Sequence, residues 1–490
     1  MLIKELPEEF KKRMMDELDE ASLQAFLSSY DCESSKSLRI NSLKKRSLKA
    51  PLTDLKSLFS LENVEWCESG RYYNGDNKPG KHPLHEAGAY YIQEASAMAP
   101  VCWLDVKPEM RVLDLCAAPG GKSTEIAELL QNTGLLVANE PVLSRAKILS
   151  LNIERMGISN TLVTSESPER LAGFFRGYFD RILVDAPCSG EGMFRKNPDA
   201  VKEWSVENTV RCASRQDMIL KEAAKMLAPG GIIVYSTCTF NRAENEGSIE
   251  RFLEDEEDFG IIDPDILRPL PDGFIKTPVR THGERVFYGV RLYPHRIKGE
   301  GHFFAVLKRK GSLSPADIEP SPGIRRSSGG SIIKAPDSEQ KLFREFREMA
   351  GITEAPGKEN GTAFSRLFSE GLIFSFGEQL YLSNTLMPGI KNLKVLRPGL
   401  HLGTLKNKRF EPSHALALFL CPDEVKIRAE LPDDSTALSF LRGEALSGEY
   451  LEYRDSKGWC LISFMGMSLG WGKYDGRLIK NHYPRGLRIH

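Results

Sequence analysis

The chain has 490 residues, of which 41% are hydrophobic, and its formal net charge is −1. This length and apolar content are enough for two to four domains with sizeable cores, and they exclude a disordered or fibrous protein. A nearly neutral chain also excludes a protein that binds a polyanion over its whole surface, so any nucleic-acid site must be a local patch.

Neither a targeting nor a membrane segment is expected from the sequence. The first ten residues carry mixed charges without an apolar core, which argues against a secretory signal. The longest apolar stretch that we find, around His414 to Cys421, is far shorter than the ~20 residues that a membrane span needs. We therefore expect a cytoplasmic protein with no membrane contact.

Residues 1 to about 100 differ in pattern from the rest and predict a small leading domain. They begin with a helical segment of mixed charge, Glu8 to Glu20, and contain the basic run Lys44 to Arg46. The boundary is expected near residue 100, where a different alternation of apolar runs begins.

Between residues 101 and 310, strand-like and helix-like runs alternate. The predicted strands are Arg111 to Leu115, Leu135 to Asn139, Thr161 to Thr164, Arg181 to Asp185 and Gly231 to Ser236. The predicted amphipathic helices are Thr124 to Leu130, Val142 to Met156 and Ser214 to Leu227. This alternation is typical of βαβ units around a parallel sheet, and it predicts a doubly wound α/β domain.

The stretch at residues 311–338 is rich in Ser, Pro and Gly, has little apolar periodicity and predicts a linker. A separate C-terminal region is therefore expected over residues 339–490, with short strands such as Glu378 to Leu382 and Trp459 to Met465. This region also carries two basic segments, Lys391 to Arg409 and Lys473 to Arg488.

The chain has nine cysteines, none of which are spaced as Cys-x-x-Cys, and the histidines do not cluster with them at zinc-ligand spacing. We therefore expect reduced thiols and no structural metal. A single cysteine is most often a small buried apolar residue. This is our interpretation of six of them: Cys32, Cys67, Cys102, Cys212, Cys421 and Cys460.

The other three cysteines, Cys116, Cys188 and Cys238, each lie at or just past the end of a short apolar run. Reactive groups gather at the carboxyl ends of parallel strands. The pattern therefore predicts a cofactor site with thiol chemistry.

The loop from Cys116 to Ser123 can be interpreted in two ways. Its Gly-Lys-Ser ending resembles a phosphate-binding loop, but such a loop needs a glycine where this chain has Cys116, which disfavours hydrolysis of a nucleoside triphosphate. The favoured interpretation is that Pro119, Gly120 and Gly121 let backbone amides approach a small molecule at the head of a helix. Glu140, which closes the second strand, would then accept hydrogen bonds from the ribose of an adenosine cofactor. The alternative is a tight turn followed by a surface glutamate.

Three ordered motifs favour the cofactor site: Asp114-Leu-Cys-Ala-Ala-Pro-Gly-Gly-Lys122, Asp185-Ala-Pro-Cys-Ser-Gly190 and Ser236-Thr-Cys-Thr239. Together they resemble the Sun-type (NSUN) family of RNA cytosine-5 methyltransferases. The segment from Cys188 to Pro198 and the end of the chain, with Gly470-Trp-Gly-Lys473, resemble the bacterial small-subunit ribosomal RNA methyltransferase F branch. The resemblance implies a Rossmann-like methyltransferase core over residues 101–310, an N-terminal α+β RNA-binding domain over residues 1–100, and a C-terminal RNA-binding region that ends in a PUA-like domain.

The resemblance also implies S-adenosyl-L-methionine as the cofactor, with no metal. Relatives commonly carry an aspartate near the adenine, just after the third strand. This chain has Ser165-Glu-Ser167 there, so Glu166 is expected to take the place of that aspartate. The residues expected at the cofactor are Cys116, Ala117, Ala118, Pro119, Gly120, Gly121, Lys122, Glu140, Glu166 and Asp185.

Methylation of cytosine at carbon 5 needs a nucleophile, because this carbon becomes reactive only after a thiolate adds to carbon 6 and forms an enamine. The carbon-5 proton must leave before the covalent bond breaks, and a second group can assist this release. By resemblance, Cys238 is the nucleophile and Cys188 is the release residue. Asp185 would hydrogen-bond the cytosine ring, and Lys122 would contact the base or favour the thiolate. The alternatives are a strand-end cap for Asp185 and a solvated helix residue for Lys122.

None of these steps requires a histidine, so we expect His85, His295 and His302 to be structural or to contact RNA. The run His302 to Val306 is expected to form a closing edge strand of the catalytic sheet.

The resemblance predicts methylation of carbon 5 of a cytidine in 16S ribosomal RNA, within the small subunit or its precursor, by a monomer. The target base must leave its stack. Three segments, Lys394 to Gly403, Lys406 to Phe410 and Trp471 to Arg488, interleave basic and aromatic residues, either as an RNA-stacking surface or as a solvated basic face.

Three alternatives remain for the function. The substrate could be transfer RNA or 23S RNA, because the motifs encode the chemistry and not the target. An assembly factor without activity is disfavoured, because it would need neither Cys188 nor Cys238. A DNA cytosine methyltransferase is also disfavoured, because such enzymes lack the Thr-Cys motif.

Overall fold

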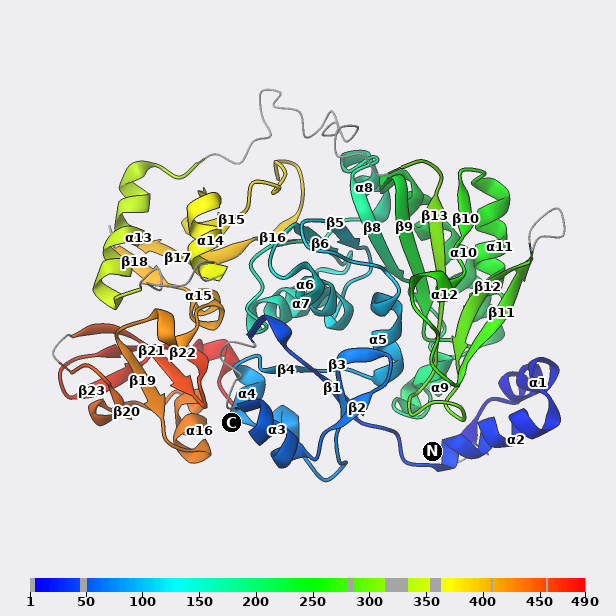
Figure 1. Ribbon diagram of the computed structural model, residues 1–490, viewed down its shortest axis with the longest axis horizontal. Coiled ribbons are helices and arrows are strands. Elements are labelled where there is room, and N and C mark those ends of the chain that lie inside the picture. Colours follow the sequence, from blue (N-terminus) through cyan, green and yellow to red (C-terminus); the bar gives the residue numbers. More distant parts are fainter. Residues whose placement is uncertain are drawn as a thin grey trace.

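The computed structural model describes residues 5–44, 51–280, 286–312, 334–352, 363–406, 409–454 and 457–489. Most of the predicted linker, and the last two residues of the basic run Lys44 to Arg46, lie outside the described residues. Figure 1 shows a large α/β unit flanked by a small N-terminal sheet with its helices and by a C-terminal lobe.

The α/β unit is built on a ten-stranded sheet in the order β11-β12-β13-β9-β8-β5-β6-β7-β16, with β10 paired to β13. The five strands from β9 to β7 are parallel, and the others are antiparallel to their neighbours. The strands are β5 Arg111–Asp114, β6 Leu135–Asn139, β7 Thr161–Thr164, β8 Phe179–Asp185, β9 Leu227–Thr237, β10 Phe259–Ile261, β11 Phe274–Arg280, β12 Val286–Leu292, β13 His302–Arg309 and β16 Val395–Pro398. The predicted doubly wound α/β fold is therefore confirmed.

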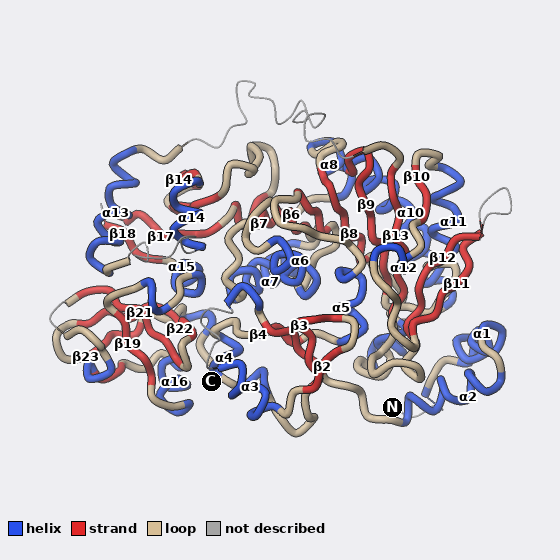
Figure 2. The backbone as a smooth tube through the Cα atoms, in the orientation of Figure 1, coloured by secondary structure: helices blue, strands red, loops and turns tan. Residues whose placement is uncertain are grey.

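Helices cover both faces of this sheet (Figure 2). One core lies under α5 Ala95–Cys102, α6 Gly121–Leu130 and α7 Leu143–Arg155, and a second lies under α8 Pro168–Phe174, α10 Val206–Met226 and α11 Glu246–Asp255. Two shorter helices are α9 Pro198–Glu203 and α12 Pro264–Leu267. Because apolar side chains pack on both sides, β6 is buried along its whole length, as its run of Leu, Val and Ala predicts.

Two strands differ from the sequence-based expectation. The strand β13 is not an edge strand, because β9 pairs with one side of it and β12 with the other. The strand β16 comes from the C-terminal region and extends the sheet beyond β7. Its Arg397 is buried and pairs with Glu154 of α7, so this part of the predicted basic segment serves the fold.

The N-terminal part has a four-stranded sheet in the order β2-β3-β1-β4. Its elements are α1 Glu8–Glu17, α2 Glu20–Ser28, β1 Ser37–Ile40, α3 Pro51–Phe59, β2 Glu62–Val64, β3 Cys67–Tyr72, α4 Pro83–Glu86 and β4 Tyr90–Ile92. The helices α1 and α2 pack their aromatic residues on Phe194, Trp204 and Phe240 of the α/β unit. These helices therefore cover the loops that follow β8 and β9.

The C-terminal lobe contains two sheets, β14-β15-β17-β18 and β19-β21-β22-β23-β20. Its elements are α13 Asp337–Ala350, α14 Ala363–Glu370, β14 Leu372–Phe376, β15 Gln379–Ser383, β17 Leu400–Lys406, β18 Arg409–Pro412, α15 His414–Phe419, β19 Arg428–Leu431, α16 Asp434–Arg442, β20 Leu446–Ser447, β21 Gly458–Phe464, β22 Met467–Tyr474 and β23 Leu478–Asn481. The rings of Trp471 and Tyr474 are buried, so they are not available to stack on a base. Within the described ranges, no helix combines the length and apolar character that crossing a membrane requires.

Candidate active site

The parallel strands end at one edge of the central sheet. Their order reverses between β5 and β8, and doubly wound sheets bind ligands at such a switch point, beyond the carboxyl ends of the strands. Asp185 ends β8, and Lys122 is the second residue of α6, the helix that follows β5. Cys188 and Cys238 lie in the loops after β8 and β9. The four residues predicted to be catalytic therefore meet at this edge.

The two cysteines are in direct contact. The sulfur atoms of Cys188 and Cys238 lie 3.3 Å apart, and both side chains are partly exposed. The backbone N–H of Gly192 donates to the carbonyl of Cys238 at 2.8 Å, which ties the two loops together. The hydrogen bond with Cys238 and, next, burial raise the pKa of the Cys188 thiol well above its ordinary value. Cys188 therefore stays a thiol at neutral pH and can donate or relay a proton.

Asp185 lies at the centre of a polar cluster. Its Oδ2 is 2.7 Å from the ammonium of Lys122, and its Oδ1 accepts a hydrogen bond of 2.8 Å from the Ser236 hydroxyl. Burial alone would raise the pKa of Asp185, but Lys122 and His302 together lower it below its ordinary value. The carboxylate is thus held ionised, with 30% of its side chain exposed to a ligand.

Lys122 and His302 share this cluster. Burial would lower the pKa of Lys122, but Asp185 and, to a smaller extent, the charge of Cys238 raise it. His302 is buried on β13 with its Nε2 3.6 Å from Asp185 Oδ1. Burial and the Lys122 charge lower the pKa of His302, so its imidazole is neutral at pH 7. His302 therefore lies next to Asp185, and its expected role, structural or in contact with RNA, stays a prediction.

Glu244 organises the two cysteine loops, although no motif in the sequence points to it. Its carboxylate accepts hydrogen bonds from the Ser189 hydroxyl at 2.5 Å, the Ser189 N–H at 2.9 Å and the Gln216 amide at 3.0 Å. The Ser189 hydroxyl also lies 2.8 Å from that of Thr239. Burial raises the pKa of Glu244 to about 7. The signal in the sequence was weak, because an acidic residue six positions after Cys238 is also typical of a helix start.

The predicted cofactor loop lies between β5 and α6. Gly120 has a φ of +115°, and a Cβ atom at this position would meet Leu149 Cδ1 at 3.1 Å. The carbonyls of Ala118 and Pro119 accept hydrogen bonds from Arg145 and Asn152 of α7. These contacts hold the loop carbonyls on the α7 side and leave the glycine-rich turn at the head of α6, a usual place for a small ligand.

Three further groups line the same edge. Asp114 is buried on β5, its Oδ1 has no hydrogen-bond partner among the described residues, and burial raises its pKa to about 7. The neighbouring Cys116 is a partly exposed thiol whose pKa burial raises. Glu140 is buried beyond β6, where Oε1 accepts from the Val142 N–H and Oε2 pairs with Arg145.

The Glu166 carboxylate binds two groups of the protein. Its Oε1 accepts a hydrogen bond of 2.7 Å from the Lys394 N–H, and its Oε2 is 2.8 Å from Arg170 Nε. The carboxylate thus anchors the segment that leads into β16.

Family models match four parts of the chain. The model described as "16S rRNA methyltransferase RsmB/F" matches residues 101–308, and "N-terminal domain of 16S rRNA methyltransferase RsmF" matches residues 6–95. "RsmF rRNA methyltransferase first C-terminal domain" matches residues 358–420, and "Methyltransferase RsmF PUA domain" matches residues 431–489. The last match confirms the PUA-like end of the chain that the resemblance implied.

Solved structures share the fold. A methyltransferase homolog protein from Pyrococcus horikoshii is 28% identical, with a TM-score of 0.51 over 59% of this chain and 91% of that chain. NSun6 from Pyrococcus horikoshii with SFG is 21% identical, with a TM-score of 0.51 over 62% of this chain and 99% of that chain. Both likenesses support the Rossmann-like methyltransferase core.

Curated relatives match nearly the whole chain. Ribosomal RNA small subunit methyltransferase F of Aliivibrio fischeri is 30% identical over 489 residues, which are 98% of this chain and 97% of that protein. The protein of the same name from Salmonella schwarzengrund is 33% identical over 503 residues, with 98% and 96% covered. These matches confirm the resemblance inferred from the three motifs. The chain therefore belongs to the ribosomal RNA small subunit methyltransferase F family.

Proposed function

We propose that this protein methylates carbon 5 of a cytidine in 16S ribosomal RNA, with S-adenosyl-L-methionine as methyl donor and a covalent bond between Cys238 and the base. The observation that carries the proposal is the contact of 3.3 Å between Cys188 and Cys238 at the switch point of the sheet. Two thiols in contact, next to an ionised carboxylate, supply what cytosine-5 methylation needs: a nucleophile, a proton-transfer group and a group that fixes the base.

The cofactor site fits this chain. Gly120 lets the turn pack closely against Leu149 of α7 at the head of α6, and the unpartnered Oδ1 of Asp114 can accept a hydrogen bond. We assign the loop Cys116 to Lys122, Glu140, Glu166 and Asp185 to cofactor binding, and Glu166 also holds the segment before β16 through its bond to the Lys394 N–H. S-adenosyl-L-methionine supplies an electrophilic methyl group when bound.

The protein groups then have these roles. The Cys238 sulfur bonds to carbon 6, which makes carbon 5 nucleophilic, and Asp185 holds the ring by hydrogen bonds. Lys122 keeps Asp185 ionised, and its ammonium is the group assigned to contact the base. After methyl transfer, the carbon-5 proton passes to solvent water through the Cys188 thiol, which gives up its own proton as it accepts this one. The electrons of the broken C–H bond restore the double bond of the ring, the bond between sulfur and carbon 6 breaks, and Cys238 leaves as a thiolate. Cys188 assists this release, because its thiol touches the Cys238 sulfur.

The outer parts of the chain are proposed to hold the RNA. We divide the chain into an N-terminal RNA-binding domain over residues 1–100, the methyltransferase domain over residues 101–310, a linker over residues 311–338 and a C-terminal RNA-binding region over residues 339–490. The match to the PUA domain of the family supports the last assignment. The proposed partner is ribosomal RNA in the small subunit or its precursor, bound by a monomer in the cytoplasm.

Bisulfite sequencing of total RNA from cells with and without the gene tests the proposal. We expect a cytidine in 16S RNA to lose its protection in the deletion strain and to regain it with the intact gene, but not with a Cys238→Ala gene. If protection changes only in transfer RNA or 23S RNA, that RNA is the substrate, and the proposed reaction is unchanged. Unchanged protection in every RNA would contradict the proposed activity.

A further inference from the structure

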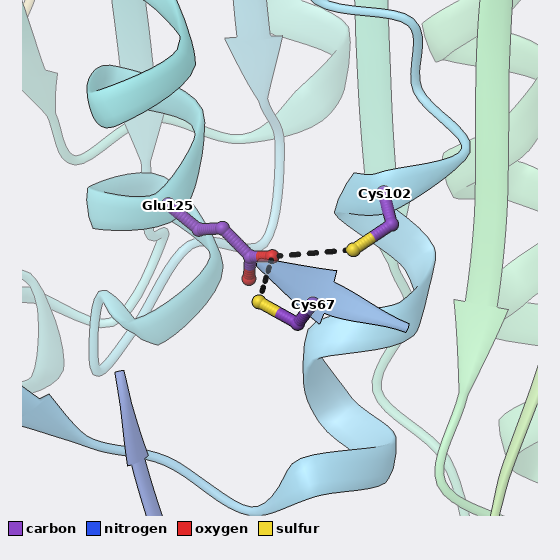
Figure 3. Close-up of side chains that lie close together, drawn as sticks. All are labelled: Cys67, Cys102 and Glu125. Carbon is purple, nitrogen blue, oxygen red and sulfur yellow. Dashed lines mark hydrogen bonds between the residues drawn. The ribbon is translucent and has the colours of Figure 1, made fainter. Parts of the chain in front are cut away.

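Three side chains that the proposed reaction does not use meet where the N-terminal sheet joins the α/β unit. Cys67 begins β3, Cys102 ends α5 and Glu125 lies in the second turn of α6. Their two sulfur atoms and one carboxylate oxygen lie within 4.8 Å of one another. Figure 3 shows that all three point toward a common centre. Because they come from three separate elements, no spacing rule along the sequence would have found them.

The distances within this cluster match those between the ligands of one metal ion. Oε1 of Glu125 is 3.7 Å from the sulfur of Cys67 and 3.7 Å from the sulfur of Cys102. In a tetrahedral site with Zn–S of about 2.3 Å and Zn–O of about 2.0 Å, a sulfur and an oxygen ligand are about 3.5 Å apart. Binding of one ion would therefore need only small movements of the side chains.

Hydrogen bonds orient the carboxylate for this purpose. The Gln93 amide donates to Oε2 of Glu125 at 3.3 Å, and the Gln93 oxygen accepts from Arg39 Nε at 3.1 Å. Oε2 is thus held on the side of Gln93, and Oε1 faces the two sulfurs. Such bonds to the atom next to a ligand atom are typical of metal sites, where they fix the orientation of the ligand.

Once the two thiols and the carboxyl group have lost their protons, a cation is needed to balance their charges. Arg39 is fully buried and pairs with Glu128, so that pair is neutral. Two thiolates and the Glu125 carboxylate would place three negative charges in the same buried region, with the Arg39 Nε 3.9 Å from Glu125 Oε2. Buried charges need compensation, and a divalent cation bound to the three ligands would balance two of them.

We propose that Cys67, Cys102 and Glu125 bind a thiophilic divalent cation of the zinc class, with a fourth position open to water. The two thiols release their protons to solvent when the ion binds. Cys102 is the partly exposed member of the cluster, and Cys67 and Glu125 are buried. This inference revises the expectation that the chain has no structural metal and that Cys67 and Cys102 are only small apolar residues. The bound ion ties β3 and α5 to α6, the helix whose head carries Lys122.

Full-length protein loaded with Zn²⁺ alone, and then freed of loosely bound metal, tests the site by elemental analysis. We expect about one zinc per chain. Glu125→Gln and Cys102→Ser should each weaken zinc binding by about 100-fold or more, since even the loss of a supporting hydrogen bond costs about 10- to 100-fold. The control Cys212→Ala removes a buried cysteine of α10 and should keep the zinc.

A second measurement needs no variant. Co²⁺ in place of Zn²⁺ should give the strong ultraviolet absorption of thiolate bound to cobalt, and this absorption should disappear when zinc is added. No retained zinc and no such absorption, or equal zinc in the two ligand variants and the control, would overturn the proposal. So would a disulfide between Cys67 and Cys102, detected by mass spectrometry in protein isolated without reductant.

Discussion

Lys122 and Asp185 form an ion pair of 2.7 Å between the head of α6 and the end of β8. The pair spans the switch point of the sheet, where the reacting atoms are proposed to meet. The second carboxylate oxygen of Asp185 accepts a hydrogen bond from Ser236 on β9. Three neighbouring elements therefore fix one ionised carboxylate beside the two thiols, before any ligand arrives. Groups fixed in this way stabilise developing charge without having to reorganise during the reaction.

Replacement of Lys122 by Met should lower kcat by about 100-fold or more, the usual cost of removing one preorganised electrostatic group. The reason is that Asp185 loses the ammonium that lowers its pKa and holds its position. Single-turnover methylation of a 16S RNA substrate measures the effect. Lys202→Met is a matched control, since Lys202 forms an exposed ion pair with Asp199 on α9 and should leave kcat unchanged. Equal rates for both variants would show that Lys122 does not contribute to the reaction.

The two thiols should give different results when each is replaced by Ala. Cys238→Ala should abolish methylation and leave cofactor binding intact, because the nucleophile is lost while the loop Cys116 to Lys122 is unchanged. Cys188→Ala should accumulate a covalent complex of protein and RNA that survives a denaturing gel, because release is slowed. The Cys212→Ala control should do neither. Turnover by Cys238→Ala would show that another group is the nucleophile. If Cys188→Ala forms no covalent complex, Cys188 has only a structural role.

Much of the central α/β unit could be predicted because short runs of neighbouring residues determine where its strands lie. The run Leu135 to Asn139 was predicted as a strand with the bounds that the structure gives β6, since a strand buried on both faces is a continuous apolar run. The motifs after β5, β8 and β9 could be placed at one edge of the sheet by the same reasoning. That Cys188 touches Cys238 follows from the pairing of β8 with β9.

The missed features depend on contacts between distant parts of the chain. The short β16 has the same local pattern as an exposed basic segment, and only its pairing with β7 makes Arg397 a buried residue. Trp471 was assigned to a stacking surface, but packing in the C-terminal lobe buries its ring. Glu244 and the cluster of Cys67, Cys102 and Glu125 likewise consist of residues whose neighbours come from other elements. Periodicity and spacing carry no information about such pairings.

The stability of the protein should depend on Glu244 between about pH 4.5 and 7. In the unfolded chain this carboxyl ionises near its ordinary pKa of 4.5, whereas burial raises its pKa in the folded protein to about 7. The folded state therefore binds more protons in this range, and the free energy of unfolding falls as the pH rises, by up to about 3 kcal/mol from this residue.

Urea denaturation at about pH 5 and about pH 7.5 measures this effect. Glu244→Gln cannot ionise, so its stability should fall less than that of the unaltered protein over the same range. Asp114, whose pKa burial also raises to about 7, remains in both proteins and contributes equally to both. The same fall in stability for both proteins would mean that Glu244 is ionised in the folded state at the lower pH.

The contact between β16 and α7 should be important for stability. Arg397 binds both Glu154 and the Ser150 hydroxyl of α7, and its side chain is only 9% exposed. Arg397→Leu leaves Glu154 buried without its guanidinium, and we expect a loss of about 3 kcal/mol in the free energy of unfolding. Chemical denaturation measures this loss.

Two comparisons separate this effect from a simple change of surface charge. The double variant Arg397→Leu with Glu154→Leu removes both charges and should recover most of the lost stability, because a buried pair replaced by apolar groups is often neutral. Lys406→Met breaks the exposed pair of Lys406 with Glu411 on neighbouring strands and should cost less than about 1 kcal/mol. If Arg397→Leu costs no more than Lys406→Met, β16 is not held to the sheet by this pair.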